Sequence, residues 1–588
     1  MVLFMDNSTD PCTDFYKFSC GNYDKNVDPN KNHVIEIYNK QDVNRDIFSK
    51  YLNFSTLKSK TTPEKIAMTL WKKCVETTSV EIYETDIWKK LDFTDILLEM
   101  AKVSITKTRF LKNDIYPSII TDGEHRLGLT LKSGIQEVFA WDYFLCHSFV
   151  IAKSPDEIEE KLKSGQTTSD FKFFDIKKYM KELLPEYAQN TTWSLIYHKN
   201  ELIALEKLVN LKGVETIRDK LKPFYDEALE KYVVSDNFTG IDRENECYKT
   251  IEKMFPGTLA MMFIEQFVPK QNLEKANQLV DEVKEVFREM IEENDWMEQE
   301  LKDGLKNEID LIKSSIGIPD EYKDMKNIEK MYESVQKTKP AEQQTYLELV
   351  RNLLAMNSEE TFLRVAREEQ IKYSGNPIYV SSNFRIGSHR TSIPPIVLNF
   401  PYIDSDLPHW NMIAALGFMI SHEIGHPFDA DSFEHDSLLV NYPMSPKNRK
   451  EFKKRVDCII SKYSKYTFSD GTFSDGKKSQ SEDTADKIGI DLVSRILKKL
   501  LITEKQQKLP ILAEYSVEQQ FFMRVAHEWC GMNFVGEYLK KAKKHVHSIG
   551  EFRINGMMSN TAAFAKAFKC AEKTPMNPEK KCPLYDSH

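Results

Sequence analysis

The chain has 588 residues, more than one domain usually contains, so two domains are expected. Hydrophobic residues make up 41% and charged residues 29%, a balance typical of soluble globular proteins and not of disordered or membrane-embedded ones. The net charge of −9, without a basic stripe or a nucleic-acid motif, excludes nucleic acid as an expected partner.

The sequence contains no run of roughly 20 apolar residues, the length that crosses a bilayer. The longest apolar stretch, 412–420, fits a buried helix. Residues 1–10 lack a basic segment followed by an apolar one, so they do not resemble a signal peptide. We therefore expect no membrane segment in this chain, while an anchor or signal ahead of Met1 stays open.

The first half of the chain is expected to be mostly helical. Apolar residues recur at helical spacing between charged positions at 61–74, 216–232, 272–297 and 341–356. These stripes predict core-facing helices and indicate no particular chemistry.

The pattern changes near Gly375, where prolines and glycines interrupt short β-prone runs such as 378–380 and predict strands and loops. A buried helix is expected at about 410–426. A loop is expected at 467–476, where Thr-Phe-Ser-Asp-Gly occurs twice, and a further helix is expected to begin close to Glu482.

The segment 421–426 reads Ser-His-Glu-Ile-Gly-His and contains the His-Glu-x-x-His pattern. Two histidines four residues apart lie one helical turn apart, so both imidazoles of His422 and His426 can reach one ion. Glu423 can then meet a water on the open side of that ion. The alternative is a pair of hydrogen-bonded core histidines, although a buried apolar helix needs a reason to carry three polar side chains.

A catalytic zinc needs a third protein ligand and an open fourth position. Glu482 and Asp486 are four residues apart at the start of a helix, so Glu482 could bind the ion while Asp486 accepts the far N–H of a ligand histidine. Ser479-x-x-Glu482 is also a capping box, which would explain the glutamate without a metal. The local pattern leaves both interpretations open.

The chain contains nine cysteines, which cluster toward its two ends and form no C-x-x-C pair, so a structural zinc ribbon is not expected. Four glycosylation sequons begin at Asn7, Asn53, Asn190 and Asn237. Clustered cysteines together with sequons favour an oxidising, extracellular environment. The alternative is an intracellular metallopeptidase with reduced cysteines, which nine free thiols would support.

Three further segments complete a family pattern. Residues 10–21 read DPCTDFYKFSCG, residues 546–553 read VHSIGEFR, and residues 576–582 read MNPEKKC. With the His-Glu-x-x-His segment and Glu482 in the same order, the chain resembles the neprilysin and endothelin-converting-enzyme family of zinc endopeptidases over nearly its whole length.

The resemblance implies one Zn²⁺ per chain, bound by His422, His426 and Glu482. It implies that Glu423 is the general base and that Asp486 and Asp429 orient His422 and His426 from the outer side. His547 and Arg553 match family residues that hold the oxyanion and a substrate carbonyl. The resemblance also implies four disulfides, Cys12–Cys570, Cys20–Cys530, Cys74–Cys247 and Cys458–Cys582, which leaves Cys146 free.

The implied fold is mostly α with a small β component: a two-domain neprilysin-like ectodomain with a thermolysin-like catalytic domain and an inserted helical capping domain. We assign residues 1–50 and 306–588 to the catalytic domain and residues 51–305 to the cap. The resemblance further implies an extracellular protein, either secreted or the ectodomain of a type II membrane protein.

Three departures from the family pattern concern the active site. The Asn-Ala-aromatic substrate strand falls on Ser381–Phe384, where the asparagine is displaced to Asn383, our candidate for substrate binding. Pro427 follows His426, so the helix is expected to end there. Ser481 stands where glycine is expected before Glu482.

We therefore predict a zinc endopeptidase that hydrolyses internal bonds of oligopeptides with a metal-activated water. The alternative is a catalytically silent relative that serves as an extracellular binding protein, and the altered segment Ser381–Phe384 is its main support.

Overall fold

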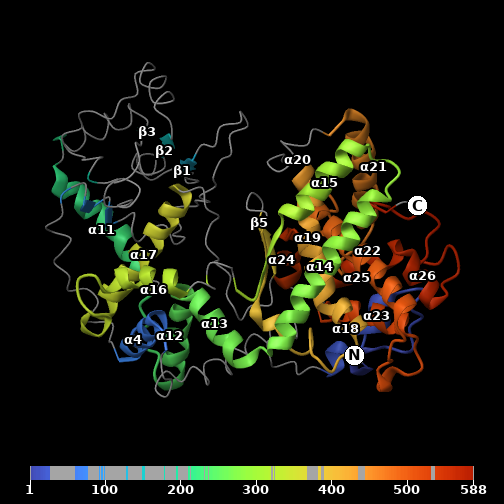
Figure 1. The fold of residues 1–588 in the computed structure, drawn as a ribbon, viewed down its shortest axis with the longest axis horizontal. Coiled ribbons are helices and arrows are strands. Elements are labelled where there is room, and N and C mark those ends of the chain that lie inside the picture. The colour runs from blue at the N-terminus through green and yellow to red at the C-terminus, as the bar shows by residue number, and fades with distance from the viewer. Residues whose placement is uncertain are drawn as a thin grey trace. The chain divides into compact units, whose positions relative to one another are not determined.

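In the computed structural model the chain forms two compact units. The first contains residues 1–50, 259–320 and 375–588, and the second contains residues 51–258 and 321–374 (Figure 1). The structure describes residues 2–26, 60–76, 92, 95–96, 98–99, 127–129, 149–152, 178, 194–196, 210–211, 213–230, 232–235, 237–318, 322, 325–366, 382–385, 390–434, 444–531 and 537–586.

The units divide the chain at other residues than the predicted domain boundaries. Residues 259–305, assigned to the cap, group with the first unit, and residues 321–374 group with the second. The physical reason is packing, because α14 (Lys270–Glu292) lies against α19 (Phe418–Gly425) and α22 (Gln480–Thr503). An amphipathic stripe predicts that a helix is buried but not which element covers it. That the second unit caps the active site stays a prediction.

Helices dominate the described residues of both units, as predicted. The first unit contains, besides α14, α19 and α22, the following helices: η1 (Val2–Phe4), α1 (Phe15–Cys20), α2 (Tyr23–Asn26), α15 (Gln299–Leu311), η7 (Pro395–Leu398), α18 (His409–Met412), η8 (Ile413–Gly417), η9 (His426–Phe428), α20 (Ala430–Glu434), α21 (Pro446–Tyr463), η11 (Pro510–Leu512), α23 (Val517–His527), α24 (Glu537–Lys544), α25 (Gly550–Asn560) and α26 (Ala562–Phe568). Helix α13 (Pro256–Phe267) begins in the second unit and ends in the first.

The second unit contains helices at the three remaining predicted stripes. Its helices are α4 (Thr62–Glu76), α11 (Val214–Glu230), α12 (Gly240–Met254), α16 (Met325–Glu333), η5 (Ser334–Gln336), η6 (Ala341–Gln343) and α17 (Tyr346–Ala366). Its strands β1 (Leu127–Leu129), β2 (Phe149–Ala152) and β3 (Ser194–Ile196) form an antiparallel sheet in that order. Of the helices in the described ranges of both units, none combines the length and apolar character that crossing a membrane requires.

A small sheet in the first unit carries the segment expected to bind substrate. Its strand order is β4 (Lys313–Ile316), β6 (Arg390–Ile393) and β5 (Asn383–Arg385). β4 runs parallel to β6, and β5 runs antiparallel to it with Asn383 opposite Ser392. Among the strands that the structure describes, β5 therefore lies at an edge of this sheet. The predicted strand at 378–380 lies outside the described residues.

The helices of the first unit meet in a core that the sequence pattern explains. The buried face of α14 contains Leu279, Val283, Val286, Phe287 and Met290, at the spacing that places them on one side of a helix. Burying side chains of this size stabilises a fold by roughly 1.5–3 kcal/mol each before the entropic cost of ordering.

Disulfides fasten the amino-terminal segment to the carboxy-terminal helices. Cys12 is bonded to Cys570, and Cys20 is bonded to Cys530. Phe15 between them packs edge-on against Phe564 and Phe568. The remaining described disulfides are Cys74–Cys247 and Cys458–Cys582, so all four pairs agree with those that the resemblance implies. Cys146 lies outside the described residues.

Tyr585 and Asp586 are held beside the turn that follows His426. The Tyr585 hydroxyl donates to the carbonyl of Phe428 at 2.8 Å, and Asn294 donates to the carbonyl of Tyr585 at 2.8 Å. Lys487 of α22 forms an ion pair with Asp586 at 3.1 Å. These buried contacts fix the turn that follows His426.

Candidate metal centre

Helix α19 and the turn η9 that follows it bring two histidines and a glutamate together. Helix α19 follows a π-helical turn at Ile413–Gly417 and is buried along most of its length. The rings of His422 and His426 lie one turn apart, with centroids separated by 4.7 Å. One potential ligand atom each from His422, Glu423 and His426 lies within 4.8 Å of the others.

Glu482 reaches the same place from the start of α22. Its Oε2 lies 3.3 Å from His422 Nε2, and its Oε1 lies 3.8 Å from His426 Nε2. Ligands held at about 2.0–2.2 Å from a tetrahedral zinc are separated from one another by about 3–3.5 Å. The three side chains are therefore spaced much as ligands of one ion would be.

Two glycines allow α19 and α22 to approach closely. A Cβ atom on Gly489 would lie 3.2 Å from the ring of Phe418 and 3.4 Å from the backbone nitrogen of His422. A Cβ atom on Gly425 would lie 3.3 Å from Ile488. Because protein cores are close-packed, a Cβ atom at either position would make a tight contact, and the two glycines avoid it.

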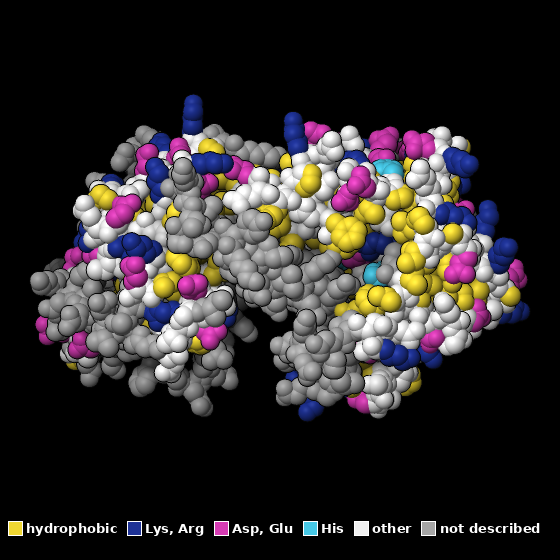
Figure 2. Space-filling view, turned by 90° about the horizontal axis from the view of Figure 1, so that it is seen from below, with side chains coloured by type: hydrophobic (Ala, Val, Ile, Leu, Met, Phe, Trp, Pro, Cys, Tyr) yellow, Lys and Arg dark blue, Asp and Glu magenta, His cyan; other side chains and the backbone are white. Residues whose placement is uncertain are grey.

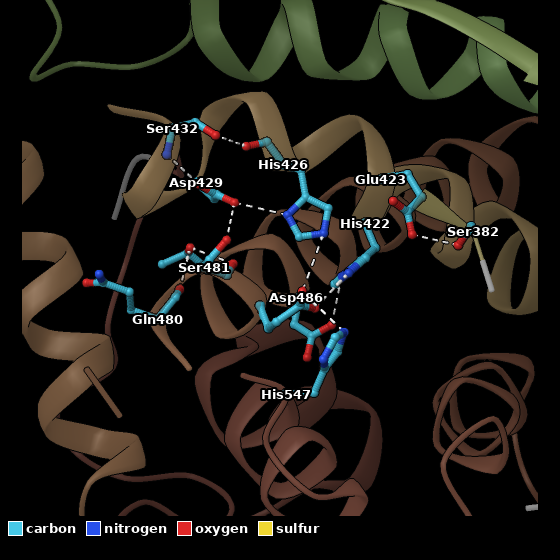
Figure 3. A network of polar contacts seen from close by, with 12 residues as sticks. Ser382, His422, Glu423, His426, Asp429, Ser432, Gln480, Ser481, Asp486 and His547 are labelled. Carbon is cyan, nitrogen blue, oxygen red and sulfur yellow. Dashed lines mark hydrogen bonds and ion pairs between the residues drawn. The ribbon is translucent and has the colours of Figure 1, made fainter. Parts of the chain in front are cut away.

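Each histidine faces a carboxylate on its outer side. His422 Nδ1 lies 2.9 Å from Asp486 Oδ1, and His426 Nδ1 lies 3.0 Å from Asp429 Oδ2 (Figure 3). A carboxylate oxygen only accepts, so these contacts favour the tautomer with the proton on Nδ1. This tautomer leaves Nε2, the nitrogen that faces Glu482 in both rings, as the atom that would bind a metal ion.

The carboxylates around His422 and Glu482 favour a positive charge between these two side chains. Burial disfavours the charged form of His422, but Asp486 and Glu482 outweigh it and raise the pKa of His422 to about 10. Burial likewise raises the pKa of Glu482, yet His422 and His426 hold it well below its usual value. Glu482 Oε2 is buried and lies 3.3 Å from His422 Nε2 and 3.8 Å from Arg553 Nη2. Two imidazole nitrogens and a carboxylate are donors that suit zinc.

Glu423 is held separately from Glu482. Its Oε1 accepts a hydrogen bond of 2.6 Å from the hydroxyl of Ser382, which precedes β5 (Figure 3). Its Oε2 is buried and has no hydrogen-bond partner among the residues that the structure describes. Both carboxylates are thus close to the histidines, but only Glu482 faces the two Nε2 atoms from a second helix.

His547 lies on the far side of Glu482. Its Nε2 is 3.2 Å from Glu482 Oε1, and its Nδ1 is 2.9 Å from Nδ1 of His545. The imidazole is 43% exposed, whereas Glu482 is nearly buried, so His547 stands between the centre and solvent. This position is compatible with the predicted role at the oxyanion.

Arg553 is placed beneath the centre by a buried ion pair. Its Nε and Nη2 each donate to a different oxygen of Asp486, both at 2.6 Å, and its guanidinium lies 3.8 Å from the ring centroid of Trp529. Burial raises the pKa of Asp486, but Arg553 and His422 outweigh it, and the pKa lies below the usual value. Arg553 therefore orients His422 through Asp486, a contact that the sequence did not reveal. Its role toward a substrate carbonyl stays a prediction.

The local predictions around the helix ends have definite outcomes. α19 ends at Gly425, and His426–Phe428 forms a 3₁₀ turn, which confirms that the helix ends where Pro427 follows His426. The capping-box interpretation of Ser479-x-x-Glu482 is wrong, because the Ser479 side chain makes no capping bond and its hydroxyl donates to Asp483. The Asn383 side chain lies outside the described residues.

Serine hydroxyls around the centre were missed from the sequence. Ser481 donates to Asp429 Oδ2, the oxygen that faces His426, and the Ser432 amide donates to Asp429 Oδ1 at 2.8 Å (Figure 3). The sequence did offer one indication of these hydroxyls, the departures from the family pattern. Ser382 lies in the altered segment Ser381–Phe384, and Ser481 stands where the family has glycine.

We expect Ser481→Ala to weaken zinc binding about tenfold, the lower end of the range for partners of metal ligands. The hydroxyl restrains Asp429 and thereby the ring of His426. The measurement is zinc affinity by competition with a chelator, with Ser494→Ala on the same helix as the matched control. Equal affinities for both variants and the unchanged protein would contradict the role of Ser481.

The surface of the first unit is apolar around a polar recess. In the space-filling view, histidine, acidic and basic side chains come to the surface within a hollow that apolar side chains border (Figure 2). Such a combination of apolar walls with a few polar groups is typical of ligand sites.

Comparisons with known proteins agree with this geometry. Two models described as peptidase family M13 match the chain, one at residues 127–319 and the other at residues 382–584. Neprilysin-11 of Caenorhabditis elegans is 25% identical over 349 residues, which cover 58% of this chain and 41% of that protein. Human neprilysin is 24% identical over 58% of this chain and 45% of its own length. The chain thus matches less than half the length of these two relatives.

Rabbit neprilysin is 22% identical over 100% of this chain and 91% of its own length. Among solved structures, the zinc metalloprotease ZMP1 of Mycobacterium tuberculosis in an open state has a TM-score of 0.69 at 15% identity, covering 99% of this chain and 100% of that chain. At such identity the likeness concerns the fold alone. Together, the two matched regions and the full-length similarity place the chain in peptidase family M13, the metallopeptidase family of the neprilysins.

Proposed function

We propose that the chain is a zinc endopeptidase that hydrolyses internal bonds of oligopeptides. The observation that carries the proposal is the convergence of His422, His426 and Glu482, whose facing atoms are 3.3 and 3.8 Å apart. The outer carboxylates Asp486 and Asp429 support the two imidazoles as they would in a zinc site.

Zinc bound by these residues would supply Lewis acidity, which lowers the pKa of a water molecule and polarises a carbonyl group. Glu423 accepts a proton from the attacking water and donates it to the amine that leaves. His547, whose Nε2 faces the centre, donates to the oxygen on which negative charge develops. Arg553 keeps Asp486 and His422 in place through its two hydrogen bonds.

The edge strand β5 supports a peptide as the substrate class. Its neighbour β6 pairs with one side of it, and an extended peptide could add to the other side by backbone hydrogen bonds. Ser382, which directly precedes this strand, contacts Glu423, so a peptide bound along β5 would run close to the proposed base. We propose Asn383, in the same strand, as a residue of this peptide site.

We further propose an extracellular location, either as a secreted protein or as the ectodomain of a type II membrane protein. Four disulfides support it, since such bonds persist in oxidising compartments. The sequon residues Asn7 and Asn237 are exposed, as glycosylation requires.

The test compares the purified chain with Glu423→Gln. We expect stoichiometric zinc in both proteins, cleavage of a mixed peptide library by the unchanged chain, and cleavage slower by roughly 10²–10⁴-fold in the variant. Removal of zinc by a chelator should abolish the activity, and added zinc should restore it.

A zinc-loaded chain that cleaves no peptide faster than Glu423→Gln would defeat the proposed activity. That result would favour the catalytically silent binding protein, the second candidate that the altered segment Ser381–Phe384 suggests. Internal cleavage products distinguish an endopeptidase from an exopeptidase in the same experiment.

A further inference from the structure

The two oxygens of Glu423 have different surroundings. Oε1 accepts the hydroxyl of Ser382 at 2.6 Å, a short distance typical of hydrogen bonds to a charged acceptor. Oε2 is buried and, in the described part of the structure, has no hydrogen-bond partner. One oxygen is therefore restrained, and the other keeps its lone pairs for another partner.

The backbone of the small sheet fixes the position of Ser382. β5 begins at the next residue, Asn383, which pairs with Ser392 of β6. β6 in turn pairs with β4 over four residues. The hydroxyl thus belongs to the residue directly before β5, while Glu423 lies in the buried helix α19 (Figure 3).

We propose that Ser382 is a positioning residue that holds the carboxylate of Glu423 through Oε1, so that Oε2 is the oxygen that accepts and returns the proton. The inference rests on the proposed peptidase function and assigns a role within it. A carboxylate turned by one hydrogen bond presents one oxygen in a fixed direction, which a proton transfer over hydrogen-bond distance requires.

The proton balance follows directly. The oxygen of the attacking water forms a bond to the carbonyl carbon as one of its O–H bonds breaks, and the released proton forms a bond to Oε2 of Glu423. That proton then leaves Oε2 for the nitrogen of the scissile bond as the C–N bond breaks, and the carboxylate is restored. Ser382 keeps its own proton throughout and donates it to Oε1 before and after the transfer.

The test uses Ser382→Ala and Ser382→Thr, with Ser314→Ala as the matched control. Ser314 accepts a hydrogen bond from Thr391 within the same sheet. Ser314 lies in β4, which β6 separates from β5, so the control removes a hydrogen-bonded hydroxyl from the opposite side of the sheet. For each protein we would measure kcat and KM on one cleaved peptide and zinc affinity by chelator competition.

We expect Ser382→Ala to lower kcat roughly 10- to 100-fold, as the loss of a hydrogen bond to a charged group does, with KM within about twofold. Ser382→Thr should retain most of kcat because it keeps the hydroxyl. Zinc affinity should be equal in all variants, since the contact that the variants remove or keep is with Glu423 and not with a proposed zinc ligand. In a Glu423→Asp background, where the shorter carboxylate no longer reaches the hydroxyl, Ser382→Ala should lower kcat no further.

Several outcomes would overturn the inference. The first is a kcat for Ser382→Ala within twofold of that of the unchanged chain, with or without a change in KM. The second is a weaker zinc affinity in Ser382→Ala. The third is a kcat that Ser382→Ala lowers as much in the Glu423→Asp background as in the unchanged chain. An active chain with any of these results would remove only the role of Ser382. A zinc-loaded chain without activity would remove the proposed function and this role together.

Discussion

Glu482→Ala protein is expected to lose its zinc, whereas Glu423→Gln protein is expected to keep it. Both carboxylates lie near the two histidines, but Glu482 faces His422 Nε2 and His426 Nε2 from a second helix, and Glu423 is engaged by Ser382. Outer partners of metal ligands contribute about 10- to 100-fold to affinity, so a direct ligand should contribute more than roughly 100-fold. Peptide hydrolysis by Glu482→Ala should fall to background.

The measurement is metal content after dialysis, followed by chelator competition. Glu504→Ala is the matched control, because it removes an exposed carboxylate at the far end of the same helix. Zinc retained by Glu482→Ala and lost by Glu423→Gln would exchange the roles assigned to the two residues. Loss from both would indicate that each of them binds the ion.

Arg553→Met is expected to destabilise the first unit by about 3–5 kcal/mol, the cost of leaving one partner of a buried ion pair without its counter-charge. Arg553 and Asp486 are both almost fully buried and are joined by two hydrogen bonds of 2.6 Å. The variant also loses the stacking of the guanidinium on Trp529. The measurement is the midpoint of urea unfolding, followed by near-ultraviolet circular dichroism.

Arg495→Met provides the control for the loss of an arginine. Arg495 pairs with the exposed Glu293 at 2.7 Å, and such a surface pair should contribute less than about 1 kcal/mol. The double variant Arg553→Met with Asp486→Asn should be more stable than Arg553→Met alone, because it removes the unpaired charge. Equal midpoints for Arg553→Met and Arg495→Met would contradict the importance of the buried pair.

The domain boundaries show a limit of local sequence patterns. The stripe at 272–297 predicted α14 closely, since helical periodicity is a property of consecutive residues. The same stripe did not indicate that α14 packs against α19 and α22, and residues 259–305 were therefore assigned to the wrong side of the division. The partner of an amphipathic face depends on the whole fold.

The sequence by itself determined the features that depend on neighbouring residues: the pairing of His422 with His426 on one helical turn, the end of that helix before Pro427, and the core-facing helices. Resemblance supplied the disulfide pairs and the choice of Glu482. Only the tertiary structure decided that Glu482 faces both imidazoles, that Arg553 pairs with Asp486, and that Ser382 contacts Glu423. The physical reason is that hydrogen bonds and ion pairs act over about 3 Å, and residues 41 to 67 positions apart come within that distance only when helices and strands pack.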